Sequence, residues 1–219
     1  MIINKLMAIQ KEIQLKVDEP NFPHKNQEII AVSKTFPISD IQPLINYGHI
    51  HYGENKVQEA LEKWQIIKVD HKELKLHMIG KLQSNKVKQA LTLFDYIHSL
   101  DNLKLAKKIS TEQIKIKKKI KIFIQVNIGS EDQKNGIHPK DTKEFYNVCV
   151  NDLGLDVIGL MCLPPNNINS ALYFSQMKLL NQQVGTNELS MGMSSDYIEA
   201  LKYGSTFLRI GSKIFGKRD

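Results

Sequence analysis

Cysteine is scarce in this chain of 219 residues, and long apolar runs are missing. The two cysteines, Cys149 and Cys162, have neither the number of a disulfide framework nor the spacing of a metal motif, so a reduced, cytoplasmic setting is expected. No apolar stretch is long enough to cross a bilayer, and charged residues interrupt the N-terminal segment. We therefore expect neither a membrane partner nor a signal peptide.

Acidic residues are fewer than basic ones, 23 against 30, which gives a formal net charge of +7. The densest basic run covers 115–121, and it could provide an electrostatic contact for a phosphate backbone. No aromatic residues are interleaved with these lysines, and no nucleic-acid motif accompanies them. We interpret the run as a solvated helix end that leads into a strand, and we expect no nucleic-acid partner.

Short apolar bursts alternate with segments of helical periodicity along the chain. We predict eight strands, at 29–33, 50–52, 76–79, 96–99, 121–127, 156–161, 188–190 and 207–210. The helices predicted between them cover 39–47, 55–67, 84–91, 103–113, 140–151, 168–182 and 195–203. This alternation indicates an α/β protein with a parallel sheet. Eight such units predict a closed (β/α)8 barrel of the TIM type, although the chain is short for that fold.

Glycine is also missing from the turn after the first predicted strand, which reads Lys-Thr-Phe-Pro over 34–37. A doubly wound open sheet, the alternative fold, would place a glycine-rich turn there, so the barrel is favoured. An extra N-terminal helix is expected over about 1–17, because apolar residues recur on one face of that segment. No linker or repeat interrupts the pattern, and we expect a single domain over 1–219.

Two basic residues stand at the tips of the first and last predicted strands, namely Lys34 and Arg209. In a closed barrel these strands are neighbours, so the two side chains would lie side by side. A lysine can form a Schiff base with an aldehyde, and an arginine can face the pyridine nitrogen of the same cofactor. The pair suggests a site for pyridoxal 5'-phosphate (PLP).

Small residues follow the last two predicted strands and resemble a phosphate cradle. Ser194 lies in one of these turns, and Gly211 and Ser212 lie in the other. Their backbone N–H groups and hydroxyls suit an anion, and barrel enzymes commonly bind phosphate in these two loops. Asn55, after the second strand, completes the candidate cofactor-binding residues.

Several of these residues also have interpretations that need no ligand. Arg209 could pair with Asp219 or with a carboxylate on the barrel rim. Ser194 and Asn55 could each cap the helix that follows. His77 is more readily explained as a hydrogen-bonded core histidine than as a catalytic base.

Longer motifs, in a fixed order, carry a family resemblance over roughly residues 29–217. They are AVSKT at 31–35, YGENKVQE at 52–59, HMIGKLQSNK at 77–86, QVN at 125–127, KNG at 134–136, GLM at 159–161, LSMGMSSD at 189–196 and RIGSKIFG at 209–216. With these motifs the chain resembles the pyridoxal phosphate homeostasis protein family, the YggS/PROSC type.

The resemblance implies a barrel like the N-terminal domain of alanine racemase. It also implies that Lys34 is the Schiff-base lysine and that Arg209 faces the pyridine nitrogen. Ser194, Gly211 and Ser212 fall on the phosphate-binding turns of the family.

Whether such a site is catalytic is a separate question. An arginine does not give up its proton, so the ring nitrogen beside it stays unprotonated and the cofactor is a weak electron sink. The chain ends directly after the eighth unit, so we expect no second domain to supply another base, and we expect a monomer. The favoured hypothesis is a non-catalytic PLP carrier in the cytoplasm that could supply apo-enzymes. A low-activity amino-acid racemase or decarboxylase is the alternative, and a basic nucleic-acid module is a third.

Overall fold

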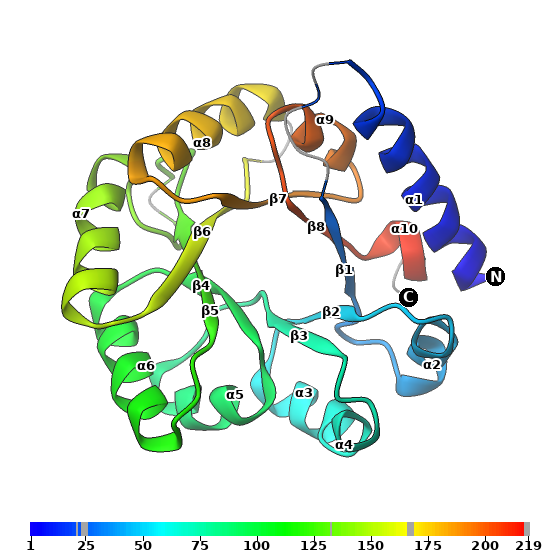
Figure 1. Cartoon of the computed structure of the whole chain (residues 1–219), viewed down its shortest axis with the longest axis horizontal. Helices are drawn as coiled ribbons and strands as arrows, with labels where there is room; N and C mark the ends of the chain where they lie inside the picture. The colour runs from blue at the N-terminus through cyan, green and yellow to red at the C-terminus, as the bar shows by residue number, and fades with distance from the viewer. Residues whose placement is uncertain (21, 23–25, 132, 166–168, 217–219) are drawn as a thin grey trace.

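The structure is a computed structural model that describes residues 1–219 except 21, 23–25, 132, 166–168 and 217–219. Eight parallel strands close into a barrel in sequence order, and helices surround it (Figure 1). The strands are β1 (Glu28–Val32), β2 (His51–Glu54), β3 (Lys75–Met78), β4 (Tyr96–Leu100), β5 (Lys121–Val126), β6 (Asp156–Cys162), β7 (Glu188–Met193) and β8 (Phe207–Ile210). The predicted barrel is confirmed, and every predicted strand is present.

Ten α-helices are assigned within the described residues. They are α1 (Ile2–Val17), α2 (Ile38–Asn46), α3 (Val57–Trp64), α4 (Ile67–Asp70), α5 (Val87–Leu93), α6 (Leu103–Ile116), α7 (Thr142–Asn147), α8 (Ser170–Val184), α9 (Tyr197–Lys202) and α10 (Ser212–Phe215). Short 3-10 turns cover Ser84–Lys86 and Pro139–Asp141, and a π-helical turn, Val148–Asp152, extends α7.

The N-terminal helix α1 lies outside the strand–helix alternation, as the sequence predicts. Its face of Leu6, Ile9, Ile13 and Val17 is buried, and the helix packs beside α2, α9 and α10. Burying four such side chains contributes roughly 1.5–3 kcal/mol each relative to exposure. The helix therefore covers the seam where the last units of the barrel meet the first.

Some predicted boundaries are wrong. The single helix predicted over 55–67 is two helices, α3 and α4, and Ile168, the predicted start of the helix over 168–182, lies outside the described residues. Strand β7 continues to Met193, beyond the predicted end at 190, so Met191 and Gly192 belong to the strand and not to the loop after it. The strand is lengthened by an irregularity: the pairing of β7 with β8 shifts between Ser190 and Met193, and Gly192 has a φ of +89°.

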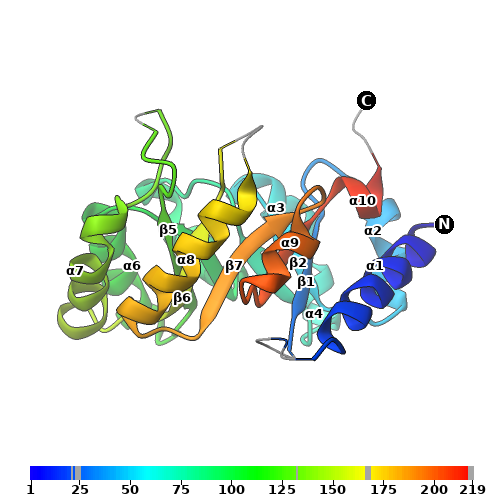
Figure 2. The ribbon, with the colours of Figure 1, turned by 90° about the horizontal axis from the view of Figure 1, so that it is seen from above.

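The barrel interior has an aromatic core of its own, separate from the larger core between the sheet and the helices. Ile30, Tyr96, Phe123, Met161 and Phe207 make up this inner core. Seen from the side, the loop after β5 and helix α10 stand at the same end of the barrel, where the carboxyl ends of the strands open (Figure 2). None of the helices in the described part of the chain is long and apolar enough to span a bilayer.

Candidate functional site

All six candidate cofactor-binding residues meet in one cavity at the carboxyl ends of the strands. We call it the upper cavity, and its volume is about 620 Å³. Its lining consists of Val32, Lys34, Phe36, Asn55, Ile79, Leu163, Met193, Ser194, Ser195, Arg209, Gly211, Ser212 and Gly216. These residues come from both ends of the sequence, and the cavity exists because β8 pairs with β1.

Lys34 lies in the tight turn that follows β1, and its side chain is half-buried. The next residue, Thr35, has a φ of +68°, a left-handed conformation that a β-branched residue rarely adopts. The N–H of Thr35 donates to Glu59 Oε1 of α3 at 2.5 Å. This bond anchors the turn to α3, and it fixes the backbone from which the Lys34 amine projects.

A buried polar cluster supports the same turn from below. The Oε1 atom of Glu54 accepts hydrogen bonds from Ser33 Oγ at 2.7 Å, from Lys63 Nζ at 2.9 Å and from Trp64 Nε1 at 3.0 Å. Lys63 also donates to the carbonyl oxygen of Ser33 at 2.9 Å. Because both members of the Glu54–Lys63 ion pair are buried, removing one partner would strand the other charge. The sequence analysis did not identify Lys63, because a lysine on an amphipathic helix carries no local sign of burial.

Arg209 is fully buried, with 4% of its surface exposed, and its guanidinium is held by two hydrogen bonds. It donates to Ser190 Oγ at 2.6 Å and to the carbonyl oxygen of Cys162 at 2.8 Å. Burial lowers the pKa of Arg209, but a guanidinium still keeps its proton at neutral pH. Among the described residues no carboxylate forms an ion pair with it; Asp132 and Asp219 lie outside the described residues.

Ser194 connects the two loops that follow β7 and β8. Its Oγ accepts hydrogen bonds from the N–H of Gly211 at 3.3 Å and from the N–H of Lys213 at 3.2 Å. Ser194 is not the helix cap that the sequence also allowed, because the N-cap position of α9 is Asp196, whose carboxylate accepts from Met193 N–H. Two backbone donors therefore converge at the rim of the upper cavity, a pattern that suits an anionic oxygen.

Asn55 lies directly after β2 and faces the upper cavity. It does not cap α3, because the N-cap residue of that helix is Lys56. The backbone of Asn55 is crowded by Gly80, where an added Cβ would lie 2.4 Å from the Asn55 carbonyl oxygen. Only glycine permits this close approach of the loop after β3.

The charged residues in the described lining of the upper cavity are all basic. Lys34 and Arg209 contribute two positive groups, and the described lining contains no aspartate or glutamate. Phe36 forms part of the wall and stacks on Phe215 with ring centroids 4.8 Å apart. An amine, an arginine, a small-residue turn and apolar walls together suit an anionic, partly aromatic ligand with an electrophilic carbonyl.

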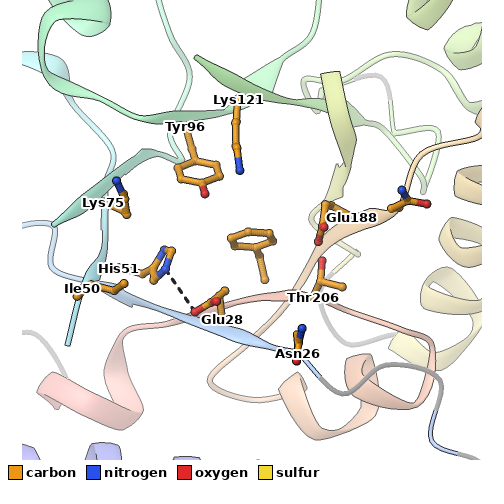
Figure 3. A pocket seen from close by; sticks show the side chains of 11 residues that line it. Asn26, Glu28, Ile50, His51, Lys75, Tyr96, Lys121, Glu188 and Thr206 are labelled. Carbon is orange, nitrogen blue, oxygen red and sulfur yellow. Dashed lines mark ion pairs between the residues drawn. The ribbon is translucent and has the colours of Figure 1, made fainter. Parts of the chain in front are cut away.

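A second cavity, of about 660 Å³, opens at the opposite end of the barrel, and we call it the lower cavity (Figure 3). It is lined by Asn26, Glu28, Ile50, His51, Lys75, Tyr96, Lys121, Asn187, Glu188, Thr206 and Phe207. None of the six candidate residues lies there. The described residues contain no cluster of three or more His, Cys, Asp or Glu that could hold a metal ion.

His77 and His98 are buried inside β3 and β4, and neither side chain reaches the loops. The interpretation of His77 as a hydrogen-bonded core histidine is confirmed, since both of its ring nitrogens have hydrogen-bond partners. His98 and Ser99 both lie within β4, in agreement with the strand predicted at 96–99. Cys162 is buried as well, which raises the pKa of its thiol to about 12 and leaves it inert as a nucleophile.

Comparison with known proteins finds a matching family model and relatives along nearly the whole chain. The family model "Alanine racemase, N-terminal domain" matches residues 16–219. A pyridoxal phosphate homeostasis protein of Pasteurella multocida is 37% identical, and the alignment covers 100% of this chain and 98% of the relative. The protein of the same name from Aquifex aeolicus is 34% identical, over 98% of this chain and 97% of the relative.

Solved structures of other proteins share the fold of this chain. PipY of Synechococcus elongatus, determined with PLP bound, superposes with a TM-score of 0.85 at 30% identity, and the match covers 99% of this chain and all of PipY. Alanine racemase from Corynebacterium glutamicum superposes with a TM-score of 0.71 over 98% of this chain and 61% of the racemase. That match has 12% identity and shows the shared fold alone.

Proposed function

This chain belongs to the pyridoxal phosphate homeostasis protein family, and from that premise we propose that its upper cavity holds PLP for intracellular PLP homeostasis. The observation that carries the proposal is the meeting of Lys34 and Arg209 in one cavity whose described lining contains no carboxylate. PLP has an anionic phosphate, an aldehyde and a pyridine nitrogen. The residues of the cavity offer a partner for each.

Lys34 is the proposed covalent anchor. Its neutral Nζ would add to the aldehyde carbon, and loss of water would leave a C=N bond in place of C=O, a Schiff base. The converging N–H groups of Gly211 and Lys213, with the hydroxyls of Ser194 and Ser212, are the proposed phosphate site. Asn55 would contact the ligand from the opposite wall.

Arg209 is the proposed partner of the pyridine nitrogen. PLP supplies an electron-accepting ring, whose strength depends on protonation of that nitrogen. Arg209 donates and cannot accept a proton from the ring, since its guanidinium stays charged. The Ser190 and Cys162 bonds hold it in this role.

We propose that the protein is not an enzyme. Apart from Lys34, no residue lining the upper cavity is a titratable base, since its described lining contains no His, Asp, Glu, Tyr or Cys. A racemase needs a second acid–base group on the other face of the substrate, and a decarboxylase needs a strong electron sink. We further propose that the chain acts as a monomer in the cytoplasm and passes PLP to apo-enzymes.

The first test is an absorbance spectrum of the purified protein with added PLP, before and after borohydride reduction. The wild type should show a Schiff-base band that reduction fixes on Lys34, identified by peptide mass. Lys34→Ala should lack the band. Lys81→Ala is the matched control: it removes an amine outside the upper-cavity lining, where Lys81 donates to Asn135 at 2.7 Å, and it should leave the band intact. A wild type without the band would contradict the proposal.

An assay for amino-acid turnover distinguishes the carrier hypothesis from the enzyme hypothesis. The loaded protein should neither racemise nor decarboxylate the common amino acids above the rate of free PLP. Sustained turnover that disappears in Lys34→Ala would show that the protein is catalytic.

A further inference from the structure

A line of hydrogen bonds runs through the closed interior of the barrel, from Arg209 toward the lower cavity. Arg209 donates to Ser190 Oγ, which lies 2.9 Å from His98 Nδ1. The Nε2 atom of His98 lies 2.9 Å from His77 Nδ1. Each of these side chains lies inside the barrel, and together they span β8, β7, β4 and β3.

The line continues to the opposite mouth of the barrel. The Nε2 atom of His77 lies 2.9 Å from His51 Nδ1, and His51 Nε2 lies 3.3 Å from the Glu28 carboxylate (Figure 3). We call His51, His77 and His98 the histidine chain. It joins the upper cavity to the lower one without a break between hydrogen-bonding groups.

The chemistry of the two ends sets the direction of every bond in the line. An ionised carboxylate only accepts, so His51 must carry its proton on Nε2 and accept at Nδ1. His77 and His98 must then carry their protons on Nε2 as well. The Ser190 hydroxyl donates to His98 and accepts from Arg209, which can only donate. The reverse direction would set the lone pair of His51 Nε2 against the Glu28 carboxylate.

The surroundings keep His77 and His98 buried and neutral. His77 stacks on Tyr96 with ring centroids 4.2 Å apart, and His98 stacks on Phe123 at 4.3 Å. Both imidazoles are fully buried, and burial holds the pKa of each well below the usual range for histidine. Neutral imidazoles linked in a low-dielectric interior polarise one another, so a change at one end is felt along the chain.

We propose that Glu28 controls the hydrogen bonding of Arg209 through the histidine chain, which makes the three histidines positioning residues of the upper cavity. The carboxylate acts as a remote counter-ion of Arg209, with which no carboxylate of the described residues forms an ion pair. In this respect the inference rests on the proposed function, since Arg209 matters to PLP only if PLP binds there. The hydrogen-bonded relay itself does not depend on the ligand.

Charged groups around the lower cavity determine when Glu28 is ionised. Burial raises the pKa of Glu28, and the carboxylate of Glu188 raises it further. Burial lowers the pKa of His51 to about 4. The charges of His49, Lys75 and Lys121 also lower this pKa, and the charge of Asp95 raises it. The hydrogen bonds of the histidine chain have a fixed direction only while Glu28 is ionised. When Glu28 is neutral, both tautomers of the three histidines become possible.

The consequence for Arg209 follows from the reversed chain. In the reversed chain His98 donates to Ser190 Oγ, which then accepts hydrogen bonds from both His98 and Arg209. The hydroxyl proton of Ser190 no longer has His98 Nδ1 as its acceptor. The bond from Arg209 weakens, and the guanidinium is held less firmly at the upper cavity.

The test is a ¹⁵N spectrum of the histidine side chains in the full chain without PLP. At pH 7 the wild type should show the Nε2–H tautomer at His51, His77 and His98. Glu28→Gln should give a mixture of both tautomers, because an amide can donate or accept. Glu188→Gln is the matched control: it removes a carboxylate from the same cavity, and the tautomers should not change.

A second readout reports Arg209 directly. Exchange of the Arg209 guanidinium protons with water should be severalfold faster in Glu28→Gln than in wild type and in Glu188→Gln. The dissociation constant for PLP should rise about threefold to tenfold in Glu28→Gln, the size expected for weakening one charge-assisted hydrogen bond.

The outcomes are distinct. Protonated or Nδ1–H histidines in the wild type, or identical spectra for both glutamine variants, would overturn the relay. A tautomer change in Glu28→Gln in a protein that does not bind PLP would support the relay and contradict the proposed function.

Discussion

Ile30 of β1 lies opposite Arg209 of β8 in the strand pairing that closes the barrel. In an open sheet, β1 and β8 would not be adjacent. Closure brings the turn that carries Lys34 beside the end of β8, so Lys34 and Arg209 line one cavity. The chemistry proposed for this chain is therefore a consequence of its topology.

Arg209 is predicted to keep the cofactor ring unprotonated. Replacing it by glutamate should stabilise the protonated pyridine nitrogen and shift the absorption of bound PLP, because a carboxylate favours a nearby positive charge. Arg209→Gln, which is neutral, should shift the spectrum less. An unchanged spectrum in the glutamate variant, with PLP still bound, would show that Arg209 does not face the ring.

The buried ion pair beneath Lys34 is predicted to stabilise the fold. Lys63→Met leaves the Glu54 carboxylate buried without its cation and should lower the free energy of unfolding by about 3–5 kcal/mol. Urea denaturation measures this. Lys16→Met breaks an exposed pair with Glu19 and should change the free energy by about 0–1 kcal/mol. If both variants lose the same free energy of unfolding, the buried pair is no more stabilising than the exposed one, and the prediction is wrong.

Gly80 is predicted to tolerate no side chain. In Gly80→Ala the new methyl group meets the backbone of Asn55, and the loop must shift, at a cost of about 1–3 kcal/mol. The displacement of Asn55 should also weaken PLP binding. Gly211→Ala is the comparison. Its added Cβ would lie 3.4 Å from Val32, an ordinary contact, so the stability of the fold should not change. Thermal unfolding of both variants, and PLP titration of Gly80→Ala against the wild type, test this prediction.

Stability is predicted to fall in mild acid. Burial lowers the pKa of His51 to about 4 and holds that of His77 far below its usual range. The unfolded chain binds these protons near pH 6.5 and the folded chain does not, so the contribution is complete above about pH 6.5 and declines below it. Each such histidine should add up to about 1.4 kcal/mol per pH unit to the slope of unfolding free energy between pH 6 and 4. His51→Gln should have a shallower slope, and an equal slope would contradict this origin.

The sequence was enough to predict the barrel and to select the residues of the upper cavity. Strand periodicity located β1 and β8, and the rule that barrel sites form at the carboxyl ends of strands pointed to Lys34 and Gly211. Their meeting in one cavity agrees with that reasoning. Their role in binding PLP stays a prediction.

The histidine chain could not be predicted in the same way. His51, His77 and His98 occupy separate strands, and no motif links their positions. They come into contact only because the strands tilt and stagger around the barrel, which sets the heights of inward-facing side chains. The extent of β7 was also missed, because Gly192 reads as a turn residue and in fact lies at an irregularity of the strand.

The hydroxyl of Ser194 has one more consequence. By accepting from Gly211 and Lys213, it occupies the point where those two amides converge, and it serves there as an internal substitute for an anion's oxygen. If phosphate binds there as proposed, the amides can return to the serine when the phosphate leaves, so neither donor is left unsatisfied. A binding site with its own internal acceptor has a smaller energetic difference between its loaded and vacant forms, which suits the carrier role proposed for this chain.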